Sequence, residues 1–194
     1  MMKKLASALV LAAVLAGCAT PPAKMGPGDS QVGRFALKVD GSWNQMPQFP
    51  GQGPAIVWTR EGLQIDRLLF WSGVKDGETI APPAPGGQAQ RPQLFRATMQ
   101  PHEVVALFES AYSADGSLFK LEKLEPTDFL GQKGFRFEFS VVRKSDDVRL
   151  AGVGWAAVNN KELHALAYTA PRKVFFPRHA RHVEQIAQSA RLKT

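Results

Sequence analysis

The chain has little of the chemistry that usually marks an enzyme or a disulfide-bonded domain. Among its 194 residues there is a single cysteine, Cys18. An intramolecular disulfide bond is therefore excluded, as is a zinc site built from several thiolates. The sequence has no Gly-x-Ser-x-Gly motif and no Walker loop, and Gly152-Val153-Gly154 lacks the third glycine of a dinucleotide-binding loop. We expect no recognisable catalytic site, no metal and no cofactor.

The sequence also lacks an apolar run long enough to cross a bilayer, which takes about 20 helical residues. The longest such run, Leu5 to Leu15, is shorter and lies near the N-terminus. Lys3 and Lys4 precede it, and Leu15-Ala16-Gly17-Cys18 ends it with small residues before the cysteine. A positive start, a short apolar centre and a small-residue end are typical of a removable export signal.

The residues Leu15-Ala16-Gly17-Cys18 match a lipobox, and the first 18 residues resemble the export signals of bacterial lipoproteins. The resemblance implies that residues 1–17 are a signal peptide and that Cys18 carries the lipid. Two or three acyl chains make such an attachment effectively permanent. In enterobacterial lipoproteins an aspartate after the lipidated cysteine retains the protein in the inner membrane. This chain has Ala19 at that position, so the resemblance favours the outer membrane, with the domain facing the periplasm. The alternative is an ordinary secretory signal with a chance cysteine.

The charge balance is basic, with a formal net charge of +7 that falls to +5 without Lys3 and Lys4. Such a balance favours anionic lipid headgroups, acidic glycans or acidic protein surfaces as partners. Nucleic acid is not expected, because export separates the chain from it and no basic-aromatic motif is present. The alternative is that the charge serves only solubility.

Composition divides the remaining chain into two parts. Residues 18–30 are rich in Pro, Gly and small side chains and predict a flexible tether, whereas residues 31–194 predict one domain. Alternating apolar residues predict strands in that domain. They are expected at 35–39, 55–59, 63–71, 118–124, 134–143, 148–158 and 162–169. Residues 73–92 have no regular pattern and predict a long loop, either functional or disordered.

Two helices are expected between and after these strands. Pro101 at a first turn and Gly116 as a stop signal predict a helix over 101–114, and a second is predicted over 177–192. The strand at 148–158 is apolar or small on both faces, so we expect it to be central and covered above and below. The fold class is α+β, with an antiparallel β-sheet of about six to seven strands flanked by helices in an α-β-α sandwich.

Several of these features together resemble the PsbP-like family of α-β-α sandwiches over residues 31–192. They are the mid-chain helix, Gly131-Gln132-Lys133-Gly134 at the start of an aromatic strand, and the closing Gln188-Ser189-Ala190-Arg191. Residues 65–73 also resemble bacterial lipoproteins of uncharacterised role. The resemblance implies an accessory or binding role, and it supplies no functional residues that can be carried over.

Two groups of residues are candidate binding sites. Arg172, Lys173, Arg178 and Arg181 form a basic cluster suited to anionic headgroups or other anions, or else merely a solvated surface. Trp43 and Phe49, on a Pro- and Gly-rich loop, could line an aromatic groove, or else pack in the core.

A histidine pair is the closest approach to a metal motif. His179 and His182 lie one helical turn apart, but projection of the helix places His179 in the apolar stripe of Val183 and Ile186, which favours a structural role. We therefore predict a lipid-anchored binding or accessory domain of the bacterial envelope, with an envelope protein or an anionic lipid or glycan as partner. The alternative is an enzyme of unrecognised class that acts on envelope material.

Overall fold

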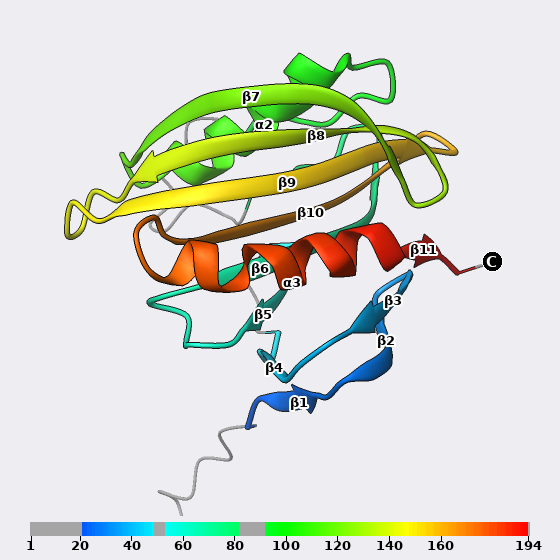
Figure 1. Ribbon diagram of the computed structural model, residues 1–194. Coiled ribbons are helices and arrows are strands. Elements are labelled where there is room, and N and C mark those ends of the chain that lie inside the picture. The colour runs from blue at the N-terminus through cyan, green and yellow to red at the C-terminus, as the bar shows by residue number, and fades with distance from the viewer. Residues whose placement is uncertain (1–20, 49–52, 82–91, 194) are drawn as a thin grey trace, which may run out of the picture.

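The central feature of the fold is an antiparallel sheet of eight strands (Figure 1). The computed structural model describes residues 21–48, 53–81 and 92–193. In spatial order the strands are β1 (Ala23–Met25), β4 (Trp43–Gln45), β5 (Ile56–Thr59), β6 (Arg67–Lys75), β10 (Glu162–Pro171), β9 (Arg149–Asn159), β8 (Gln132–Val142) and β7 (Leu118–Phe129). A second sheet contains β11 (Arg191–Leu192), β3 (Phe35–Val39) and β2 (Gly28–Val32).

Helix α2 (Pro101–Ser113) covers one face of the large sheet. Proline suits its first position because that N–H needs no partner there, and the backbone N–H of Gln100 donates to the Glu103 carboxylate at 2.6 Å. The ring of Phe108 packs 4.9 Å from Phe137 of β8 and 5.2 Å from Trp71 of β6, measured between ring centroids. These contacts fix α2 against the sheet.

Helix α3 (Phe175–Ser189) and the three-stranded sheet cover the opposite face. Val183 and Ile186 of α3 are fully buried in this second core, together with Phe35 of β3 and Tyr168 of β10. The main sheet therefore separates two apolar cores, one under each layer. Strand β10 is central and its interior residues are all buried.

The mixed α+β architecture, with a large antiparallel sheet between helices, is confirmed, but the number of strands is higher than the six to seven predicted. The additional strands are short, between two and five residues. They pair through backbone hydrogen bonds and carry little apolar alternation, so periodicity does not reveal them. The strand at 148–158 is buried on both faces as predicted.

The predicted tether over residues 18–30 needs correction, because the described chain is already in strands at Ala23. Strand β1 pairs with β4, and β2 pairs with β3. The predicted loop from residue 73 also starts late, since β6 continues to Lys75, and residues 82–91 lie outside the described part. Glycine and proline are tolerated in short paired strands at the edge of a sheet, so a composition rich in them wrongly predicted a tether at these residues.

The two edges of the large sheet differ. Strand β1 is a short edge, whereas β7 is a long edge with a register shift between Leu121 and Lys123 opposite β8. Figure 1 shows these two strands at opposite sides of the molecule, with β7 above and β1 below. Within the residues described, neither helix has both the length and the apolar character needed to span a bilayer.

Candidate functional site

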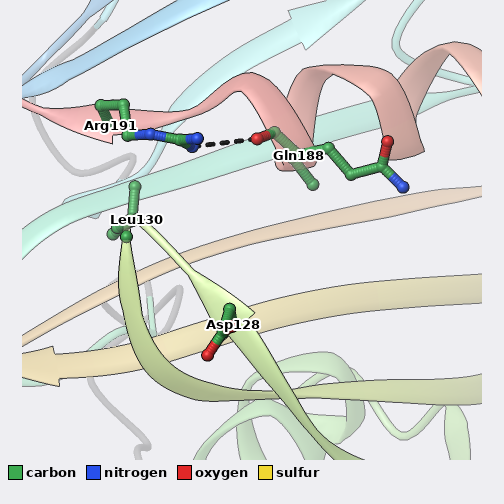
Figure 2. Close-up of a pocket in the computed structure, with 6 residues that line it drawn as sticks. Asp128, Leu130, Gln188 and Arg191 are labelled. Atoms are coloured by element: carbon green, nitrogen blue, oxygen red, sulfur yellow. Dashed lines mark hydrogen bonds between the residues drawn. The ribbon is translucent and has the colours of Figure 1, made fainter.

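One side of α3 borders two cavities in succession, which we call together the α3 groove. The first, of about 280 Å³, lies beside Phe176, Pro177, Ala180 and Glu184. The second, of about 340 Å³, lies beside Ala187, Gln188 and Arg191 (Figure 2). These positions recur every three or four residues and so share one face of the helix. Together the two cavities border about 20 Å of that face, at a rise of about 1.5 Å per residue.

The groove exists because α3 packs over β10 and β9 and leaves the outer strands β8 and β7 beside it uncovered. Arg136 and Glu138 of β8 form the opposite wall of the first cavity. Asp128, Leu130 and Gly131, at the turn between β7 and β8, form the opposite wall of the second. In Figure 2 Leu130 and Asp128 lie across from Gln188 and Arg191.

Arg136 is the centre of the charge network in the groove. Its guanidinium donates to Glu138 at 2.5 Å and to Glu125 at 3.2 Å, and its Nε lies 3.9 Å from the carboxylate of Glu184 across the groove. The same guanidinium lies 5.5 Å from the ring centroid of Trp155, a cation–π contact. Charges of both signs therefore face one another in the first cavity.

The ionisable side chains that line the two cavities are carboxylates and guanidinium groups. Among the described residues that line the two cavities there is no Ser, Thr, Cys, His, Lys or Tyr. Arginine keeps its proton at physiological pH and cannot act as a base. The carboxylates of Glu138 and Glu184 lie near Arg136, and Glu122 pairs with Arg172 at 3.3 Å. The groove can hold a ligand by charge and shape.

The four residues of the predicted basic cluster are all exposed, but they do not form one free patch. Arg172 is paired with Glu122 of β7, and Arg178 is paired with Glu61 at 3.4 Å. Lys173 and Arg181 have no ion-pair partner in the part of the chain that the structure describes. The start of α3 turns the chain between these residues, so Arg172 lies toward β7 and Arg178 toward the loop between β5 and β6.

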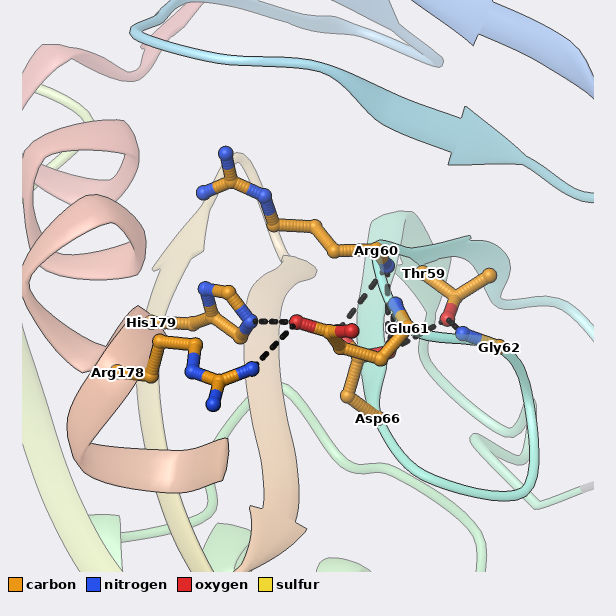
Figure 3. Close-up of polar contacts among 7 residues, drawn as sticks. All are labelled: Thr59, Arg60, Glu61, Gly62, Asp66, Arg178 and His179. Atoms are coloured by element: carbon orange, nitrogen blue, oxygen red, sulfur yellow. Dashed lines mark hydrogen bonds and ion pairs between the residues drawn. The ribbon is translucent and has the colours of Figure 1, made fainter. Parts of the chain in front are cut away.

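A second polar site joins α3 to that loop (Figure 3). His179 is buried, as the helix projection predicted, and its Nε2 lies 2.7 Å from the Glu61 carboxylate. The hydrogen bond from His179, with help from the Arg178 guanidinium, holds the pKa of Glu61 below its usual range. His182 makes a similar contact with Asp40 after β3. Two imidazole–carboxylate pairs thus attach one helix to two loops.

The loop carries Glu61 in a fixed position because Asp66 organises its backbone. The buried Asp66 carboxylate accepts from the Thr59 hydroxyl at 2.6 Å and from the Glu61 N–H at 2.8 Å, and it also accepts from the N–H of Arg60. The Gly62 N–H donates to the Thr59 hydroxyl oxygen at 2.8 Å. This arrangement could not be predicted, because Glu61 and His179 are 118 residues apart in the sequence. The described residues contain no cluster of three or more His, Cys, Asp and Glu side chains suited to a metal ion.

Comparison with known proteins bears on the fold. No protein-family model matches the chain, and no curated protein matches it either. Among solved structures, the solution structure of cyanobacterial PsbP (CyanoP) from Synechocystis sp. PCC 6803 matches with a TM-score of 0.58 at 12% sequence identity. The match covers 93% of this chain and 99% of that one. This chain has a PsbP-like fold.

The predicted aromatic groove is wrong for Trp43, which is fully buried. In the PsbP-like fold of this chain, β4 pairs with β5 and turns the Trp43 ring inward, 6.4 Å from Trp58 and 6.2 Å from Tyr168 between centroids. Short strands without apolar alternation read as a loop in the sequence, which is why the ring was placed at the surface. Phe49, the other residue of that prediction, lies outside the described residues.

His164 of β10 is the buried polar side chain that sequence reasoning left without a role. It is fully buried, burial lowers its pKa, and neither ring nitrogen has a hydrogen-bond partner among the residues that the structure describes. Its neighbour across the strands is Ser72, whose hydroxyl oxygen accepts from the Arg34 N–H at 2.7 Å. Glu162 lies 3.9 Å from the imidazole and is paired with Arg34. Ser72, His164 and Glu162 therefore lie near one another, but they do not form a hydrogen-bonded relay.

Proposed function

We propose that this chain is a lipid-anchored binding protein of the bacterial envelope, and that its α3 groove holds an extended polypeptide segment of a partner protein. The observation that carries the proposal is the groove itself. Its two cavities lie along one face of α3, its walls carry charges of both signs, and the described residues that line it include no Ser, Thr, Cys, His, Lys or Tyr. A binding role accounts for these three properties together, whereas catalysis would fall to carboxylates, of which Glu122, Glu138 and Glu184 are paired with arginine.

The dimensions and charges of the groove favour a peptide over other envelope ligands. About 20 Å accommodates about six residues in extended form, at about 3.3 Å per residue. Arg136 and Arg172 alternate with Glu122, Glu138 and Glu184 along the walls of the first cavity, which matches a segment that itself carries both acidic and basic side chains. An acyl chain in the groove would remove water from these charges and offer them no hydrogen bonds in return, which costs free energy.

The sequence supports the anchor. The positive start, the apolar run and Leu15-Ala16-Gly17-Cys18 favour acylation of Cys18, and Ala19 favours the outer membrane. Mass spectrometry of protein extracted from the membrane is expected to find an acylated N-terminal Cys18, and Cys18→Ser is expected to accumulate as an unprocessed precursor. A soluble mature chain with an unmodified cysteine would contradict the anchor.

Site-specific crosslinking in intact cells tests the groove. A photoreactive amino acid is placed at Ala180, which lines the groove, or at Gln185, which is exposed on the same helix but does not line it. We expect Ala180 to crosslink to one short partner segment with side chains of both charges, identified by mass spectrometry, and Gln185 to give no such product.

A charge reversal sharpens this test. Glu184→Lys places a cation near Arg136, so we expect the Ala180 crosslink to weaken at least several-fold, whereas Gln185→Lys leaves it unchanged. Thermal melting of both variants establishes that the fold is intact. Equal crosslinking in the two variants, or equal yields from the two probe positions, would reject the groove as the binding site.

A further inference from the structure

We infer that the edge formed by β1 and β4 lies against the lipid surface, so that β7 and the adjoining α3 groove point away from the membrane. The inference rests on the proposed lipid anchor at Cys18 and adds the orientation of the domain. Here the proximal edge means residues 21–28 and 43–48, which form β1, β4 and the chain next to them.

The covalent reach of the anchor limits the distance between β1 and the membrane. Cys18 precedes Ala23, the first residue of β1, by five residues. Five residues span at most about 18 Å when fully extended, at about 3.6 Å per residue. An acylated Cys18 sits at the membrane surface, so β1 cannot lie farther from that surface than this reach. Because β1 starts within the predicted tether, the lipid holds this edge of the sheet close to the membrane.

The width of the sheet sets how far β7 lies from β1. Strands β1 and β7 are its two edges, with six strands between them. Neighbouring strands lie about 4.8 Å apart, so the far edge is about 34 Å from β1 measured along the sheet. This separation exceeds the reach of the anchor. When the sheet stands on its β1 edge at the membrane, β7 lies on the opposite side of the molecule, well above the lipid (Figure 1).

The two edges also differ in charge. The residues of the proximal edge include one cation, Lys24, and no Asp or Glu. A surface of anionic headgroups therefore attracts this edge weakly and meets no carboxylate there. The β7 edge instead carries three carboxylates, Glu122, Glu125 and Asp128, against two cations, Lys120 and Lys123. The ion pair between Arg172 and Glu122 also holds one member of the basic cluster toward the far edge.

Energy transfer to the bilayer tests the orientation. Because the one native cysteine is occupied by lipid, a cysteine introduced elsewhere is the only free thiol. Lys24→Cys on β1 and Lys120→Cys on β7 are both exposed positions and accept a donor dye. The full lipidated proteins are placed in vesicles of phosphatidylethanolamine and phosphatidylglycerol that contain an acceptor-labelled headgroup.

We expect strong quenching of the donor at position 24 and much weaker quenching at position 120, with a difference in distance to the headgroups of about 20–30 Å. Replacement of Arg172, Lys173, Arg178 and Arg181 by Gln is expected to leave this difference unchanged. Equal quenching at both positions, stronger quenching at 120, or a loss of the difference in the Gln variant would overturn the orientation while leaving the anchor intact. Failure of the proteins to float with the vesicles would overturn the anchor, and the orientation with it.

Discussion

The phenyl ring of Phe137 in β8 lies over Gly154, its cross-strand partner in β9. Phe139 lies over Gly152 in the same way, two residues along. A methyl group at either glycine would fall closer to the ring than carbon atoms can approach. Both rings belong to the core under α2, so the glycines are required for the packing of that core and not for a turn.

Gly154→Ala is therefore expected to destabilise the domain by about 1–3 kcal/mol, the usual cost of overpacking a core. Chemical denaturation of the domain without its lipid measures the change. Gly26→Ala is the matched control, since a Cβ there meets no atom within 4 Å, and we expect it to be neutral. Equal stability of the two variants would show that the β8–β9 contact is loose.

The contact between Glu61 and His179 predicts a pH-dependent loss of stability. Glu61 has a lowered pKa in the folded protein, so its contribution is present above the unfolded value of about 4.3 and is lost as the pH falls through the folded value. At pH 7, Glu61→Gln is expected to lower the free energy of unfolding by about 1 kcal/mol, because a hydrogen bond to a charged acceptor becomes a neutral one.

The difference between Glu61→Gln and the wild type is expected to close as the pH falls below the lowered pKa of Glu61, because the carboxyl is then protonated in both folded and unfolded chains. Glu109→Gln, at an exposed position on α2, is the control and should leave stability unchanged across this range. A constant difference from pH 7 to pH 3 would mean that the Glu61 charge contributes nothing.

His164 also predicts a loss of stability in acid, because this buried histidine stays neutral in the folded protein. Burial, together with the nearby Arg34, holds its pKa below 6.5 in the folded protein, so the unfolded chain takes up a proton first as the pH falls. Stability then declines below about pH 6.5, by at most about 1.4 kcal/mol per pH unit. In His164→Leu this decline should be smaller by about 1–2 kcal/mol between pH 7 and pH 5.

Denaturation series at several pH values measure this decline. His102→Leu, on the exposed side of α2, is the comparison and should retain the wild-type slope. If His164→Leu and the wild type lose stability in parallel, the buried imidazole does not govern the acid sensitivity of the domain.

Trp155 of β9 gives a test of the core under α3. Its side chain is buried and lies beneath the Arg136 guanidinium. Removal of a buried Trp side chain costs about 3–5 kcal/mol, so Trp155→Ala is expected to unfold the domain or to lower its melting temperature strongly, while Trp155→Phe costs less. A wild-type melting temperature for Trp155→Ala would contradict the placement of this ring.

The sequence predicts best where periodicity is long. Helix α2 differs by one residue from the predicted 101–114, and strands β8, β9 and β10 lie within two residues of their predicted limits. The short strands β1 and β4 escaped prediction because three residues cannot show an alternating pattern, and Trp43 was misplaced with them. The α3 groove could not be predicted, since it depends on which strands α3 leaves uncovered.

The edge strand β7 has a consequence for how copies of this protein meet one another. Its backbone groups are open to another strand, but its exposed side chains include Lys120, Glu122, Lys123 and Pro126, and its register shifts at Glu122. Charges, a proline and an irregularity on an edge all hinder the addition of a further strand. Even when many copies lie side by side, the sheet is thus protected from growing into a polymer through this edge.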